Sequence, residues 1–233
     1  MAITLQSSSG YVALSGLNTT TCIWTPGTAA ANGNMAVVVL SATQTAATVS
    51  TVTGGGVATW TKGKETQSGS LCASVWYGIA DGTGGAITAT WSAKQNGGKS
   101  AIGGAFVGVK TTTPVDVTGT STGGSATTYT TASSGSTTNA GDVVVAGLTH
   151  TNATVTGSLT GPTSSFANFA APSWAGLAAY LIATATGDYS TSWTDTPSWF
   201  WASSTIALFP AAPPFRPREG LRVRQAVNRA STY

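Results

Sequence analysis

The chain alternates short runs of β-branched and aromatic residues with clusters of Gly, Asn, Asp, Ser and Pro. Helical periodicity of apolar residues is almost absent before residue 210. This pattern is typical of an antiparallel β-sandwich or barrel. The strands that it predicts in the first half lie at residues 11–14, 20–24, 35–40, 47–52, 57–61, 75–80, 87–91 and 101–109.

Three stretches give more specific predictions. Residues 35–40 are continuously apolar, which indicates a strand buried on both faces. Residues 71–91 alternate around a Gly-rich turn at 81–85 and predict a β-hairpin. Residues 110–140 are dominated by Thr, Ser and Gly, so they form either a linker or, as we favour, a long surface crossing with one or two edge strands.

The second half of the chain echoes the first. Residues 141–146, 179–183 and 201–209 repeat the patterns of 34–39, 76–80 and 101–109, which predicts a weak internal duplication with pseudo-repeats at about 34–110 and 141–210. A jelly-roll-like β-sandwich absorbs such a duplication, although two tandem sandwiches would also produce it. We therefore predict one sandwich over residues 1–210, followed by an extended C-terminal arm over residues 211–233.

Charge divides the chain at the same place. Only 7% of residues are charged, yet eight Trp, six Tyr and six Phe argue against disorder. Five lysines and six acids nearly cancel before residue 210, whereas all five arginines lie in the arm. A near-neutral body with a Pro- and Arg-rich arm indicates a module that is anchored by one end.

The arm leaves three interpretations open: a solvated tail, a nucleic-acid-binding segment, or a segment that docks on a neighbouring protein. Apolar residues interleave its arginines, which favours docking on a protein and makes nucleic acid the least favoured partner. The predicted anchoring residues are Phe215, Arg216, Arg218, Leu221, Arg222, Val223, Arg224, Val227, Arg229 and Tyr233.

The N-terminus lacks the features of a secretory signal, and no apolar run is long enough to span a bilayer. We therefore expect synthesis in a reducing cytoplasm and no membrane association. In that setting Cys22 and Cys72 are expected to be buried thiols rather than a disulfide.

Catalytic chemistry is not evident in the sequence, and we predict that the protein is not an enzyme. His150 is the only histidine and follows a predicted strand, and the acids are too sparse for a convincing carboxylate pair. No cofactor is predicted. Asp81 could take part in a loop calcium site, but Asp81 and Asp188 are better explained as turn residues.

Aromatic side chains are densest near the end of the body. Trp174, Trp199, Phe200 and Trp201 would form a glycan-stacking platform if they were exposed on one face. If they are buried, they belong to the core or to a subunit contact, which is the interpretation that we favour.

Several strand motifs together resemble a group of tailed-phage and actinobacterial proteins with a lectin-like or jelly-roll sandwich. These motifs are Thr-Trp-Thr at 59–61, Val-Trp-Tyr at 75–77, Gly-Asp-Val-Val-Val at 141–145 and Ala-Leu-Phe-Pro-Ala at 207–211. The resemblance covers residues 30–212, excludes most of the arm and implies a virion accessory protein. The expected role is capsid decoration, with a minor tail or fibre component, or a glycan-binding adhesion module, as alternatives. The implied location is the virion, in several copies and in contact with other capsid or tail subunits.

Overall fold

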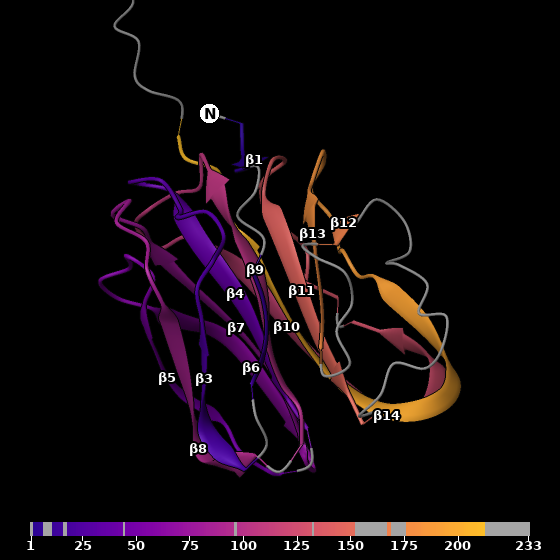
Figure 1. Ribbon diagram of the computed structural model, residues 1–233. Coiled ribbons are helices and arrows are strands. Elements are labelled where there is room, and N and C mark those ends of the chain that lie inside the picture. Colours follow the sequence, from indigo (N-terminus) through magenta and orange to yellow (C-terminus); the bar gives the residue numbers. More distant parts are fainter. Residues whose placement is uncertain are drawn as a thin grey trace, which may run out of the picture.

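The computed structural model describes residues 2–6, 11–15, 18–43, 45–95, 97–131, 133–151, 167–168 and 176–212. These residues form antiparallel strands in three sheets (Figure 1). None of the described residues lies in a helix. The all-β antiparallel fold predicted from the sequence is therefore confirmed.

Sheet A has six strands from the first half of the chain. Its order is β1-β9-β4-β7-β6, and β2 also pairs with β9. The strands are β1 (Thr4–Leu5), β2 (Tyr11–Ser15), β4 (Met35–Ala42), β6 (Thr61–Ser68), β7 (Leu71–Ile79) and β9 (Lys99–Val107).

Sheet B is smaller and comes from the same half of the chain. Its central strand, β8 (Ile87–Gln95), pairs with β3 (Thr19–Trp24) on one side and with β5 (Val49–Gly54) on the other. Because β7 and β8 belong to different sheets, the hairpin predicted at 71–91 is wrong. The Gly-rich segment after β7 carries the chain from sheet A to sheet B instead of joining two paired strands.

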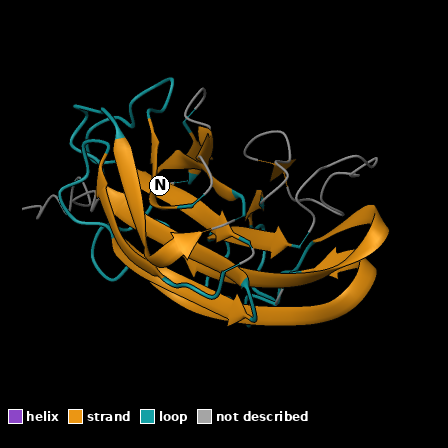
Figure 2. Cartoon of the chain, turned by 60° about the horizontal axis from the view of Figure 1, so that its bottom comes forward, coloured by secondary structure: helices purple, strands orange, loops and turns teal. Residues whose placement is uncertain are grey.

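Sheet C is formed by the second half of the chain, in the order β10-β14-β11-β13-β12. Its strands are β10 (Val115–Thr130), β11 (Val143–His150), β12 (Ala167–Asn168), β13 (Leu177–Ile182) and β14 (Ser192–Leu208). The edge strand expected within 110–140 is thus present as β10. β10 and β14 are far longer than the other strands, and they curl strongly at one end (Figure 2). Their pairing shifts register between Gly123 and Thr128, and such irregularities let a sheet bend.

Sheet A lies between the other two sheets (Figure 1). Side chains alternate along β4, so odd-numbered residues from Met35 to Val39 enter the core shared with sheet C. Even-numbered residues from Ala36 to Ala42 enter the core shared with sheet B. All eight residues of β4 are buried, which confirms the prediction of a strand covered on both faces.

Sheets A and C approach closely where β11 crosses β4. A Cβ atom on Gly147 would lie 2.4 Å from a methyl carbon of Val39, so only glycine fits there without a shift of the neighbouring chain. A third core covers the other face of sheet C, where Tyr129, Trp193 and Trp201 pack under the curled part of β10 and β14.

The central strands of sheets A and C have the same order. β4 pairs with β9 and β7, and β11 pairs with β14 and β13, in both cases antiparallel. Met35 lies opposite Phe106 and Ile79, as Val143 lies opposite Leu208 and Ile182. A duplicated unit would produce this correspondence.

Candidate functional site at the base of the arm

The arm leaves the body as a direct continuation of β14. After Leu208, residues 209–211 are hydrogen-bonded to residues 108–114, the connection between β9 and β10. The Lys110 amide donates to the Phe209 carbonyl oxygen at 2.9 Å, and the Phe209 amide donates to the Pro114 carbonyl oxygen at 2.8 Å. The Ala211 amide donates to the Gly108 carbonyl oxygen at 2.6 Å. The start of the arm is therefore fixed to both large sheets.

One side of the β9–β10 connection borders an apolar groove of about 540 Å³. Met35, Tyr77 and Ile79 from sheet A line it together with Pro114. Ile79 is one of the few large apolar side chains left exposed among the described residues. Thr113, also on the rim, has a φ of 47°, a conformation that β-branched residues rarely adopt.

The other side of this connection borders a smaller cavity of about 390 Å³ at the start of the arm. It is lined by Lys110, Asn139, Phe209, Pro210, Ala211 and Ala212. The Lys110 ammonium lies 5.0 Å from the centre of the Phe209 ring. Within the described residues, Lys62 forms an ion pair with Glu65, whereas Lys110 forms none.

Two carboxyl groups meet near this cavity. Asp116 is half-buried, and its carboxylate accepts hydrogen bonds from the Thr138 amide at 2.6 Å and the Thr138 hydroxyl at 3.0 Å. Asp142 is fully buried, and its carboxyl group interacts with the Asp116 side chain and with the backbone of Asn139. Burial and, after it, the neighbouring Asp116 carboxyl together raise the pKa of Asp142 to about 7, although a hydrogen bond from the Asn139 backbone opposes this shift.

The sequence does not reveal this pair, because acids are sparse along the chain. The two residues lie far apart in the chain and meet only because β10 and β11 both begin at this end of sheet C. The one sequence signal was the position of Asp142 immediately before a buried apolar strand, where a carboxylate is costly.

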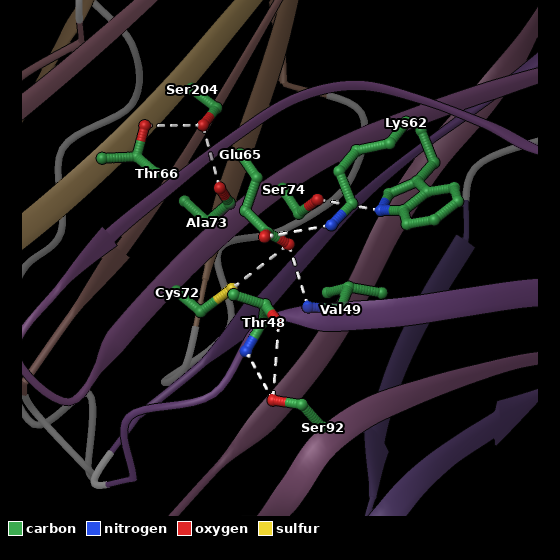
Figure 3. A network of polar contacts seen from close by, with 11 residues as sticks. Thr48, Val49, Lys62, Glu65, Thr66, Cys72, Ala73, Ser74, Ser92 and Ser204 are labelled. Atoms are coloured by element: carbon green, nitrogen blue, oxygen red, sulfur yellow. Dashed lines mark hydrogen bonds and ion pairs between the residues drawn. The ribbon is translucent and has the colours of Figure 1, made fainter.

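Elsewhere, polar networks join the three sheets to one another (Figure 3). The Glu65 carboxylate on β6 accepts from the Val49 amide of sheet B at 2.9 Å and pairs with Lys62 at 3.0 Å. The Thr66 hydroxyl donates to the Ser203 carbonyl of sheet C at 2.6 Å. The buried Cys72 thiol also donates to the Glu65 carboxylate at 3.8 Å, and together these contacts hold the sheets in place.

Lys99 is a buried cation that forms no ion pair with a carboxylate of the described residues. Its ammonium donates to the Thr19 and Thr21 carbonyl oxygens at 2.7 and 3.0 Å and to the Thr19 hydroxyl. Burial lowers its pKa. The three oxygens replace the water that the ammonium loses, so Lys99 fastens β3 to β9.

The predicted turn and thiol residues behave as the sequence indicated. The Asp81 carboxylate accepts from the Thr83 amide and hydroxyl at 2.8 and 2.7 Å, which lowers its pKa. Asp188 is exposed in the connection after β13. Cys22 and Cys72 are both buried and do not form a disulfide.

His150 ends β11 and is fully buried. Its ring stacks on Tyr129, with ring centres 5.5 Å apart and an interplanar angle of 8°. Within the described residues, no three His, Cys, Asp or Glu side chains come together in a way that could hold a metal ion.

The predicted aromatic platform is divided between two faces of β14. Trp201 is buried and Trp199 is half-buried on the core side, whereas Phe200 is 58% exposed. Trp174 and the ten predicted anchoring residues of the arm, from Phe215 to Tyr233, lie outside the described residues.

Comparison of the chain with models of known protein families, with curated proteins and with solved structures found no match. Among the described residues there is no helix with the length and apolar character needed to cross a membrane.

Proposed function

We propose that this protein is a structural component of a bacteriophage virion, attached to neighbouring subunits by its C-terminal arm. Its body is best described as a jelly-roll-like sandwich in which sheets A and C pack face to face, with sheet B as an additional layer. The favoured position is the capsid surface, as a decoration or stabilising protein. A minor tail or fibre position is the alternative that the same resemblance supports.

The observation that carries the anchoring role is the continuity between β14 and the arm. β14 is hydrogen-bonded along one side to β10 and along the other to β11. A pull on the arm along the strand axis therefore loads two rows of hydrogen bonds together instead of opening them one by one. Residues 209–211 add further bonds to the β9–β10 connection.

Charge supports the same role. The arm concentrates all five arginines of the chain, whereas the body before it is close to neutral. Long-range attraction to an acidic surface would then act at the arm and orient the molecule during assembly. Once the arm has docked, release requires that arm contacts and body contacts break together, which is the expected mechanism of cementing.

A glycan-binding role receives less support from the geometry. Stacking on sugars requires several exposed aromatic faces side by side, and of Trp199, Phe200 and Trp201 only Phe200 is prominently exposed.

A truncation tests the proposal. A chain ending at Ala212 keeps every hydrogen bond at the base of the arm, so it should fold with an unchanged unfolding midpoint but fail to sediment with purified virions of the phage that encodes it. The control is the full chain with Gln225→Ala, which should sediment normally. Absence of the protein from purified virions, or loading of the truncated chain at the level of the full chain, would show that the proposal is wrong.

A further inference from the structure

The apolar groove beside the β9–β10 connection is built into the body of the protein. A Cβ atom on Gly78 would lie 2.4 Å from a methyl carbon of Val57 and 2.6 Å from the Thr59 carbonyl oxygen, so glycine lets the segment before β6 press against β7 and form one wall. Another wall is Pro114, whose carbonyl oxygen accepts a hydrogen bond from the Phe209 amide at 2.8 Å. Because both walls are fixed, a partner would meet a groove that is already formed.

The groove combines an exposed apolar side chain with an uncharged lining. Ile79, at the end of β7, is 41% exposed, whereas Tyr77 is half-buried and Met35 is fully buried. None of the described residues that line the groove is charged. Depletion of charge around an apolar patch is typical of the centre of a protein–protein interface.

We propose that this groove is a contact between two copies of the chain, related by a two-fold axis that passes close to Ile79. In a two-fold contact the same patch meets itself, so the patch must carry both an inserted group and the hollow that receives it. This patch carries both, because Ile79 projects at the border of a groove of about 540 Å³. The Ile79 side chain of each copy would enter the groove of the other.

The absence of charge in the lining favours a second copy as the partner. A two-fold axis places each charged group close to its own copy, so a charged patch would repel itself, whereas this patch does not. The lysines that adjoin the lining residues in sequence have partners of their own. Lys62 pairs with Glu65 at 3.0 Å, and the Lys110 ammonium lies 5.0 Å from the centre of the Phe209 ring. A strongly acidic or basic partner would find no charge in the groove to recognise.

Pairing through the groove goes beyond the proposed anchoring role and does not depend on it. Residues 209–211 are hydrogen-bonded to the connection that supplies Pro114 to the groove, so the base of the arm lies beside the proposed contact. A pair of bodies joined here would present two arms from one unit. Two linked arms hold a surface more tightly than one, because the second arm binds at a high effective concentration.

The experiment is sedimentation velocity of the full chain over a range of concentrations in about 0.5 M NaCl, which screens the charges of the arm. The wild type should form a concentration-dependent dimer. Ile79→Asp should weaken dimerisation at least about tenfold, because it brings two carboxylates together in an apolar contact. Ile23→Asp is the matched control, since Ile23 is 63% exposed on β3 and does not line the groove, and it should dimerise like the wild type.

A mixture of variants separates a two-fold contact from a defect in folding. Ile79→Asp and Ile79→Lys should each dimerise weakly alone, whereas their equimolar mixture should dimerise at least about tenfold more tightly, because opposite charges then meet across the axis. Thr59→Glu changes an exposed position on the wall and should weaken dimerisation without lowering the urea midpoint.

Three results would overturn the inference: a wild type that stays monomeric at every concentration, an Ile79→Asp chain that dimerises like the wild type, or a mixture no tighter than its components. If only the chain truncated at Ala212 dimerises, the arm itself occupies the groove, and the inference is overturned as well. None of these results decides the anchoring role, which is tested separately by the loading of the truncated chain onto virions.

Discussion

Gly123 on β10 lies directly opposite Trp201 on β14, and the indole fills the space that a side chain at position 123 would need. A Cβ atom placed on Gly123 would lie 2.1 Å from the indole nitrogen and 2.5 Å or less from two ring carbons. The missing side chain thus leaves room for the Trp201 indole beside β10, in the core under the curled end of sheet C.

Gly123→Ala should therefore lower the free energy of unfolding by about 1–3 kcal/mol, because the buried indole must move out of a packed core. Urea denaturation followed by tryptophan fluorescence measures the change. Gly124→Ala is the matched control, since a Cβ atom there meets nothing within 4 Å. Equal stability of the two variants would contradict this account of the curl.

Asp142 should make stability depend on pH. Its folded-state pKa, about 7, lies above the value of about 4 expected for an unfolded chain, so the folded state binds more protons between these limits. The contribution of Asp142 to stability is therefore present at low pH and is lost as the pH rises from about 4 to about 7.

Asp142→Asn should become more stable relative to the wild type as the pH is raised from 5 to 8, with little further change above pH 8. Urea midpoints at dilute protein concentration measure this difference. Asp188→Asn, which removes an exposed carboxylate, should show no such trend. If the difference in urea midpoint between the wild type and Asp142→Asn does not change with pH, Asp142 is ionised normally in the folded state and this prediction is wrong.

Lys99→Met should destabilise the protein by about 1–3 kcal/mol. Methionine keeps most of the buried volume but loses the hydrogen bonds that the ammonium donates to Thr19 and Thr21, which hold β3 to the edge of β9. Lys94→Met, on β8, which pairs with β3, changes an exposed lysine and should cost much less. The comparison is made by chemical denaturation at neutral pH.

Cys22 and Cys72 should resist alkylation in the folded protein. Burial and the Glu65 carboxylate raise the pKa of Cys72 to about 12, so almost no thiolate is present at pH 8, and Cys22 is fully buried. Mass spectrometry after iodoacetamide treatment should find no label in buffer and two labels in urea. Ser136→Cys, at an exposed position, should add one label under native conditions. Rapid native labelling of Cys72 would contradict its burial.

The sequence pattern predicted strands well where one rule applied to the whole strand. The apolar run that begins at Met35 and the run that begins at Val143 both became strands buried on two faces. The pattern did not predict β6, where residues 62–67 are mostly polar. It predicted a shorter strand at 57–61 instead. β6 is the edge strand of sheet A, and four of its first five residues are charged or threonine, so pairing with β7 rather than composition defines it.

Strand partners were harder to predict than strands. β7 and β8 follow each other closely and look like a hairpin, but both faces of β7 are buried, so alternation along it does not reveal which neighbour it pairs with. For the same reason the Asp116–Asp142 pair could not be foreseen, because it depends on which strand ends share one edge of the molecule.

The division of the sheets along the chain has a consequence for synthesis on the ribosome. All strands of sheets A and B lie before residue 108, and all strands of sheet C lie after residue 114. A nascent chain can therefore complete two sheets while Met35, Val37 and Val39 still face water, because their cover includes Ile206 and Leu208 near the end of β14. We expect this uncovered face to be the point at which a stalled or shortened translation product aggregates or recruits a chaperone.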